Sequence, residues 1–284
     1  MKNMNMPAKR DFGWELKPVE STRFGIHQKD NGQFCVVLNH SLLRGVTSEM
    51  IHWWFLNFPN LTVNLVDIEG YEGEKVPAYL LWHPSDHLSA SLSGNLGPGS
   101  TSKAGAVIEI KEAMQYLKYG WKYPVNNKLR IFYCDKDGWA MGKELPFIGK
   151  VMSLRIHYKD IYDNDEILGV HYHYEIVIGT GGNNPISRFI NQRVTSHFSP
   201  EFFEAWHTHN VIEVGTFENF LPALHEQRHS PDTISYSKSM NGASLSQTSQ
   251  EAYAPSLFEQ RIQGYRESEN AHSYQAIDSK TFLK

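Results

Sequence analysis

The feature that most constrains the fold is the order of the secondary-structure signals, in which several strands precede one long helix. Strand patterns rich in β-branched and aromatic residues cover residues 106–113, 128–135, 150–158 and 167–179. A helical pattern follows at 201–227. Consecutive strands joined by short turns pair antiparallel. We therefore expect an α+β fold in which a curved antiparallel sheet grips a long C-terminal helix and encloses a cavity.

Local signals define where the helices begin and end. Ser199 and Pro200 provide the N-cap and first position of the long helix, and Pro222 is expected to kink it or mark its last turns. An earlier helix is expected at residues 47–59, where apolar residues recur at helical spacing before a proline. A strand at 33–38 precedes that helix.

The chain divides into three regions by composition. Residues 1–60 form a smaller N-terminal region, and residues 61–229 hold the sheet and the long helix of the expected catalytic domain. Residues 230–284 begin with a serine-rich stretch that has few large apolar side chains, which favours an extended or disordered tail. A short docking helix is expected within this tail at 256–267.

Composition excludes several classes of protein. The 284 residues carry a formal net charge of −4, which argues against a strongly basic nucleic-acid binder. Only Cys35 and Cys134 are present, so a disulfide-rich scaffold and a cysteine-based zinc cluster are excluded. No window approaches 18 uninterrupted apolar residues, and the first residues lack the apolar core of a secretory signal. We expect a soluble cytoplasmic protein without nucleic-acid or membrane partners.

The sharpest chemical motif is HTHNVIE within the long helix. His209 and Glu213 are four residues apart, so they project from one face of the helix one turn apart. Large aromatic residues share that side, which places the pair toward the interior, where a metal ion could satisfy both groups. The alternative is a His–Glu pair that satisfies itself on a half-exposed helix.

A second motif, WHPSDH, places two histidines four residues apart. Pro84 opposes a regular strand, so His83 and His87 lie at a bend where ligands are often found. Either histidine could bind a metal ion, and Asp86 could orient one of them. An ordinary polar turn is the alternative.

Two strands carry further candidates. Glu109 and Glu112 lie on opposite faces of the strand at 106–113, so at most one of them enters a cavity. In the HYHY block at 171–174, imidazoles lie on one face and phenols on the other, and one face could line a pocket for a phenolic ligand. An ordinary amphipathic strand is the alternative, and His157 on the preceding strand is a further candidate.

Taken together, these motifs resemble the 2,4-diacetylphloroglucinol hydrolase family, which includes phloretin hydrolase. The likeness covers residues 40–225 and rests on paired tryptophans in the early helix, Tyr-x-x-x-HPxxH, a glutamate-bearing strand and a late HxxxE. The resemblance implies zinc-dependent C–C bond hydrolysis, a Bet v 1-like, START-related helix-grip domain with a smaller N-terminal region, and a homodimer.

The resemblance also implies roles for individual residues. The residues that match the family's zinc ligands are His87, Glu112, His209 and Glu213. Those that match its substrate-side residues are Tyr79, His157 and Tyr172. Glu109 competes with Glu112 for the strand position. This chain has Ala90 where the family carries a substrate-contacting Asn, so the ring and acyl pattern of the substrate stays open.

Three functions follow. The first is a zinc-dependent hydrolase that cleaves the aryl-ketone C–C bond of an acylated polyphenol, such as an acylphloroglucinol or a phloretin-like substrate, to a carboxylic acid and a phenol. The alternative is a non-catalytic helix-grip protein that carries an aromatic or lipid-like ligand, because fold alone does not determine function. A third is a different reaction, such as ester hydrolysis, at the same metal site.

Overall fold

The computed structural model describes residues 5–94, 103–230 and 234–240, so the docking helix expected at 256–267 lies outside the described residues. The strands are β1 (Arg23–Gln28), β2 (Phe34–Asn39), β3 (Leu43–Arg44), β4 (Thr62–Leu65), β5 (Glu74–Pro77), β6 (His87–Ser93), β7 (Val107–Ala113), β8 (Pro124–Asp135), β9 (Gly138–Leu145), β10 (Gly149–Asp163), β11 (Glu166–Ile178) and β12 (Ser235–Tyr236). The helices are α1 (Ser48–Asn57), α2 (Tyr79–Trp82), α3 (Tyr116–Tyr119), α4 (Pro185–Thr195), α5 (Pro200–Gly215) and α6 (Phe217–Glu226), with 3-10 turns η1 (Val19–Ser21), η2 (Gly120–Lys122) and η3 (Lys238–Met240).

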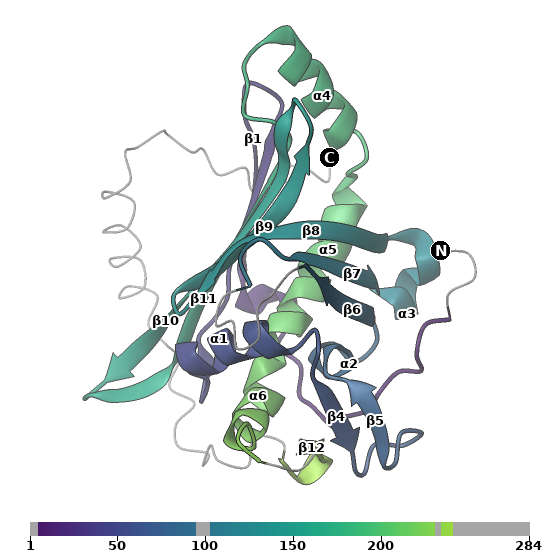
Figure 1. The fold of residues 1–284 in the computed structure, drawn as a ribbon, viewed down its shortest axis with the longest axis vertical. Helices are drawn as coiled ribbons and strands as arrows, with labels where there is room; N and C mark the ends of the chain where they lie inside the picture. The colour runs from purple at the N-terminus through teal and green to yellow at the C-terminus, as the bar shows by residue number, and fades with distance from the viewer. Residues whose placement is uncertain (1–4, 95–102, 231–233, 241–284) are drawn as a thin grey trace.

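A large antiparallel sheet dominates the fold, as expected for this α+β chain. Within the described residues it has nine strands in the order β1-β2-β11-β10-β9-β8-β7-β6, with β3 attached to β11 (Figure 1). All pairings among these strands are antiparallel. β1 and β2, from the first 60 residues, therefore belong to the same sheet as the strands that follow. A small second sheet contains β12, β4 and β5.

The single long helix predicted for 201–227 is in fact two consecutive helices. Ser199 caps α5 by accepting a hydrogen bond from the Phe202 N–H, as predicted. The helix then ends at Gly215, before the expected kink at Pro222. At the break, the Thr216 hydroxyl lies within hydrogen-bond distance of two carbonyl oxygens, that of Glu213 in the preceding turn (2.7 Å) and that of Trp82 outside the helix (2.8 Å). The break thus coincides with a contact made outside the helix, and the helical periodicity of the sequence did not predict the break.

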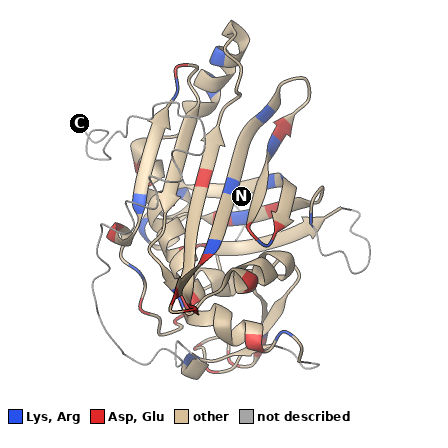
Figure 2. Cartoon of the chain, turned by 90° about the vertical axis from the view of Figure 1, so that its left-hand side faces the viewer, with Lys and Arg blue, Asp and Glu red and all other residues tan. Residues whose placement is uncertain are grey.

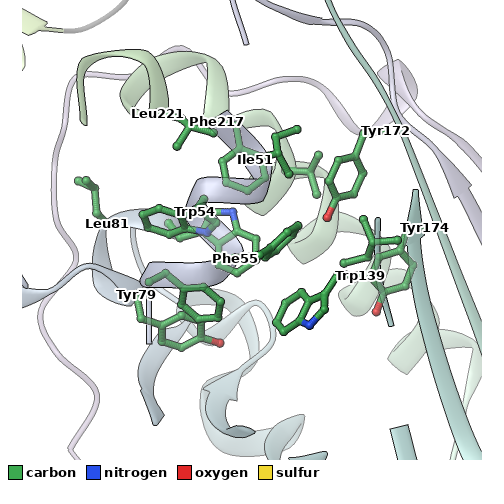
Figure 3. Packing of buried hydrophobic residues seen from close by; sticks show 14 of the residues in the cluster. Ile51, Trp54, Phe55, Tyr79, Leu81, Trp139, Tyr172, Tyr174, Phe217 and Leu221 are labelled. Atoms are coloured by element: carbon green, nitrogen blue, oxygen red, sulfur yellow. The ribbon is translucent and has the colours of Figure 1, made fainter. Parts of the chain in front are cut away.

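The early helix forms as its sequence predicts and builds an aromatic core. Thr47 caps α1 by accepting a hydrogen bond from the Met50 N–H. Trp54 and Phe55 are buried, and the ring centroid of Phe55 lies 4.5 Å from that of Trp139 on β9. Figure 3 shows this aromatic cluster, with the side chain of Tyr79 among it. Of these rings, Tyr79 and Trp139 line the cavity described below, and Trp54 and Phe55 pack behind them.

Charges of both signs cover the outside of the molecule. On the face of the described chain that Figure 2 shows, basic and acidic positions are interspersed. Lys111 and Lys128, for example, both pair with Glu109 at 3.2 Å. No helix within the described ranges is long and apolar enough to cross a membrane.

Candidate metal centre and cavity

His87, Glu112 and His209 come together between the sheet and α5, and Glu213 approaches His87 from α5. His87 opens β6 and lies opposite Glu112 in the β6–β7 pairing. His209 and Glu213 project from the same side of α5, one turn apart. His87 Nε2 lies 3.6 Å from Glu112 Oε2 and 3.4 Å from Glu213 Oε1, and His209 Nε2 lies 3.7 Å from Glu112 Oε2. The structure thus brings together all four residues predicted as ligands.

The choice between the two glutamates of β7 follows from strand alternation. Glu112 is buried and points into the cavity, together with Ile110 on the same face. Glu109 points to the other face and pairs with two lysines on the outside. Because side chains alternate along a strand, only one of the two glutamates can reach His87.

Hydrogen bonds orient both histidines toward the point of convergence. His87 Nδ1 lies 2.8 Å from the carbonyl oxygen of Tyr79, so this nitrogen donates and Nε2 is left with its lone pair. His209 Nδ1 donates to Asp86 Oδ2 at 3.0 Å. Both Nε2 atoms then face Glu112. Among the described residues, the buried His87 Nε2 has no hydrogen-bond partner, as expected for an atom that binds an ion.

Asp86 is saturated with donors and serves as a support for His209. Besides the His209 ring, its carboxylate accepts hydrogen bonds from the backbone N–H groups of Gln115 (2.7 Å) and Tyr116 (3.0 Å). The Ser85 hydroxyl donates at 3.0 Å. Burial alone would raise the pKa of Asp86, but the hydrogen bond and charge of His209 and the hydrogen bond from the Gln115 N–H lower it below its usual value. The side chain is therefore ionised and holds the His209 ring in one orientation.

His83 belongs to this supporting group. Its Nδ1 accepts the backbone N–H groups of Ser85 (3.2 Å) and Asp86 (3.1 Å), so the ring proton is on Nε2. Its ring stacks on His209, with centroids 4.7 Å apart and an interplanar angle of 10°. Burial lowers the pKa of His83 well below its usual value, so the ring stays neutral. His83 therefore has no free lone pair for an ion.

The acidic surroundings control the protonation of His209. Burial by itself lowers the pKa of this ring. The charge of Glu112 and the hydrogen bond to Asp86 outweigh burial and raise the pKa to about 9. At neutral pH the ring therefore holds a proton that a cation on its Nε2 would replace.

Tyr79 contacts the centre directly. Its hydroxyl donates to Glu112 Oε2 at 2.6 Å, and its ring stacks on His87 with centroids 3.9 Å apart. Burial, followed by the charge of Glu112, raises the pKa of Tyr79 well above its usual value. The phenol therefore stays protonated and orients Glu112, a contact that the sequence did not predict.

A cavity of about 200 Å³ extends from this centre between the sheet and α5. Tyr172 and Tyr174 of β11 both line it, so the phenols of the HYHY block face inward as one alternative predicted. Burial, followed by the charge of Glu213, raises the pKa of both phenols. The indole nitrogens of Trp82 and Trp139 are buried without a hydrogen-bond partner within the described chain. The cavity wall thus offers several donors for oxygen atoms of a ligand.

The structure does not bring His157 to this cavity. It pairs with His173 across β10 and β11, and both lie on the outer face of the sheet. Its neighbours Ile156 and Tyr158 are buried on the inner side. Because alternate residues of a strand face opposite sides, His157 cannot share a face with Tyr172, whose register partner is Tyr158.

Sequence reasoning missed a buried relay behind Glu213. His40 Nε2 lies 3.0 Å from Asn210 Oδ1, and Asn210 Nδ2 donates to Glu213 Oε2 at 3.3 Å. Burial lowers the pKa of His40 to about 3, so its ring is neutral and donates through Nε2. Asn210 is next to His209 in the helical motif, so its sequence position could have marked it as a site residue. His40 directly follows β2, far from the motifs, and nothing in the sequence linked it to the site.

One comparison with known proteins agrees with the resemblance seen in the sequence. Residues 15–104 match the family model described as "DAPG hydrolase PhiG domain", which confirms the family resemblance there. A solved structure, "Crystal structure of Ara h 8.0201", matches with 12% identity and a TM-score of 0.28, covering 66% of this chain and 98% of that one. No curated protein matches the chain.

Proposed function

We propose that this chain is a zinc-dependent hydrolase that cleaves the aryl-ketone C–C bond of an acylated polyphenol. The observation that carries the proposal is the buried His87 Nε2, which lacks a hydrogen-bond partner in the described chain and faces two carboxylates. The family match supports the reaction class and includes Tyr79 and His87.

The four donor groups fit a zinc ion in number, type and spacing. Donor atoms about 2.0–2.1 Å from a tetrahedral ion are about 3.3–3.4 Å apart. The separations of 3.4, 3.6 and 3.7 Å between imidazole nitrogens and carboxylate oxygens are close to this value. Glu112 and Glu213 together balance two positive charges. The group around Asp86 is a poorer fit, because the Asp86 carboxylate already accepts four hydrogen bonds. His83 Nε2 has no partner in the described chain, but it carries the ring proton and offers no lone pair.

The proposed reaction adds water across the bond between ring and acyl carbon. The acyl carbon gains the OH group of water and becomes a carboxylic acid, while the ring carbon gains the proton and the ring is released as the free polyphenol. When bound, zinc would polarise the acyl carbonyl and lower the pKa of water. The ring leaves as an enolate, and the hydroxyls of Tyr172 and Tyr174 are placed to donate hydrogen bonds to its oxygens. Aromatic side chains exclude bulk water from these contacts.

The second candidate is a non-catalytic carrier of an aromatic ligand, which the apolar lining of the cavity favours. Glu213→Gln separates the two functions, because it removes a charge from the centre and keeps the cavity's shape. We expect acid release from acylphloroglucinols to fall by orders of magnitude, and binding of a phenol to stay within about tenfold, or 1.4 kcal/mol.

Glu109→Gln is the matched control, since it makes the same chemical change on the outer face of β7. It should retain full acid release. Wild-type protein that binds phenols but releases no acid across a broad panel of acylphenols in the presence of zinc would favour the carrier.

A further inference from the structure

The cavity changes character along α5. His209 and Glu213 line it at the metal centre, followed by Trp206 and then Phe203 toward the start of the helix. From Glu213 to Phe203 the helix advances about 15 Å at about 1.5 Å per residue. One end of the cavity is therefore ionic and the other aromatic.

The same change occurs along β11. Tyr172 and Tyr174 line the cavity near the centre, and the next inward residues of the strand are Ile176 and Ile178. From Tyr174 to Ile178 the strand advances about 14 Å at about 3.4 Å per residue. Hydroxyl groups thus give way to purely aliphatic side chains in the direction in which α5 becomes aromatic.

The neighbouring strands continue the apolar end. Leu154 and Met152 of β10 are the register partners of Ile176 and Ile178, and Met141 of β9 is the register partner of Leu154. All line the cavity. Away from the metal centre and its phenols, Asn127 is the one amide or charged side chain among the described lining residues. This end of the cavity offers apolar contact and very few polar partners.

The apolar end also reaches the surface. Met152 and Phe202 are half-buried; at the centre His87 and His209 are buried and Glu213 is half-buried. Phe198, just before α5, lines the same side and is half-buried as well. An occupant would therefore place its polar part at the enclosed end and its apolar part toward the opening.

We infer that the cavity holds an extended apolar acyl chain, so that the substrates are phenolic ketones with acyl groups considerably longer than acetyl. The residues that form this tail subsite are Met141, Met152, Leu154, Ile176, Ile178 and Phe203. The inference rests on the proposed function for the phenolic head and the ketone. Burying each additional methylene contributes about 0.8 kcal/mol, which is about fourfold in affinity.

The test is a titration of the purified protein with 4-alkylresorcinols, which have a phenolic head, an alkyl chain and no ketone to hydrolyse. Tryptophan fluorescence reports binding, since Trp82, Trp139 and Trp206 line the cavity. We expect Kd to fall about fourfold per methylene from ethyl to hexyl, about 250-fold in total. Equal Kd values for the ethyl and hexyl compounds would overturn the inference.

Variants of Met152 test whether the alkyl chain of the ligand occupies the tail subsite. Met152→Trp fills the subsite from its half-buried side, and should raise Kd for the hexyl compound at least tenfold while leaving the ethyl compound within twofold. Met152→Gln keeps the length but adds an amide, and should act in the same direction if the tryptophan variant fails to fold. Leu145→Trp is the control, because this half-buried residue of β9 does not line the cavity. Equal losses for both alkyl compounds would contradict the assignment.

Hydrolysis is measured separately with acetyl- and hexanoylphloroglucinol. We expect the hexanoyl compound to have the higher kcat/KM. If neither compound releases acid while the alkylresorcinol series gains affinity, the proposed function fails and the tail subsite stands. If both are cleaved equally and Kd does not change with chain length, the tail subsite fails and the proposed function stands.

Discussion

Two histidine–carboxylate clusters share His209, and they differ in how their donor atoms are used. In the cluster of His83, Asp86 and His209, the carboxylate accepts four hydrogen bonds and the His83 lone pair accepts two backbone N–H groups. In the cluster of His87, Glu112 and His209, the His87 Nε2 has no hydrogen-bond partner in the described chain. Residue type and proximity mark both clusters as candidate metal sites. His83 Nε2 has no hydrogen-bond partner there either, but it carries the ring proton, whereas His87 Nε2 carries the lone pair. The two ring tautomers and the saturated Asp86 carboxylate distinguish the binding cluster from the supporting one.

The largest expected effect on zinc content and acid release is that of His87→Gln, with His83→Gln as the comparison. His87→Gln removes a free nitrogen donor, and we expect zinc content to fall far below one per chain and acid release to fall about 10³-fold. His83→Gln removes only a supporting ring and should retain one zinc per chain. Elemental analysis after dialysis against zinc checks both variants. Equal loss of zinc from both would break the distinction between the clusters.

Asp86→Asn tests the supporting role itself. The amide cannot hold the imidazole N–H of His209 as a carboxylate does, so zinc affinity should fall about 10–100-fold. Stoichiometric zinc should return at high zinc concentration, because all four proposed ligands remain. A competition titration with a chromophoric chelator measures the affinity. An unchanged affinity would show that Asp86 does not support the centre.

Tyr79→Phe removes the hydroxyl that donates to Glu112 at 2.6 Å. A hydrogen bond to a charged group contributes about 1.5–3 kcal/mol, so we expect turnover to fall at least tenfold through loss of alignment. Zinc should stay at one per chain, since the phenol is not among the proposed ligands. Initial rates of acid release and zinc content are measured on the same preparation. Full activity, or loss of the metal, would contradict this role.

Zinc affinity should also depend on pH. The pKa of His209 is raised to about 9, so below that pH a proton must leave before the ring binds an ion. Apparent affinity should rise about tenfold per pH unit between pH 6 and 8 and level off above about 9. In Asp86→Asn, which lacks one cause of the raised pKa, the plateau should begin at lower pH. An affinity independent of pH would contradict a proton held on His209.

Local patterns predicted much of this molecule, and contacts between distant segments account for the remainder. The cap at Thr47, the alternation in β11 and the inward face of His209 and Glu213 each depend on neighbours in sequence. At the break, the Thr216 hydroxyl contacts a carbonyl of its own helix, that of Glu213, and the distant carbonyl of Trp82, and only the first contact is local in sequence.

The position of His157 shows the same limit in the candidate site. Spacing along the sequence matched it to Tyr172, but the strand register decides which face each residue occupies, and the two face opposite sides. The relay from His40 to Glu213 was equally hidden, because it forms only when β2 and α5 pack together.

Removal and return of the metal tests the central claim most directly. Zinc per chain and acid release from acylphloroglucinols are measured on one wild-type sample before chelation, after chelation and after zinc is added back. We predict one zinc per chain, loss of acid release in proportion to zinc removed, and recovery of both on addition of zinc. Full acid release from protein shown to be free of metal would contradict the account.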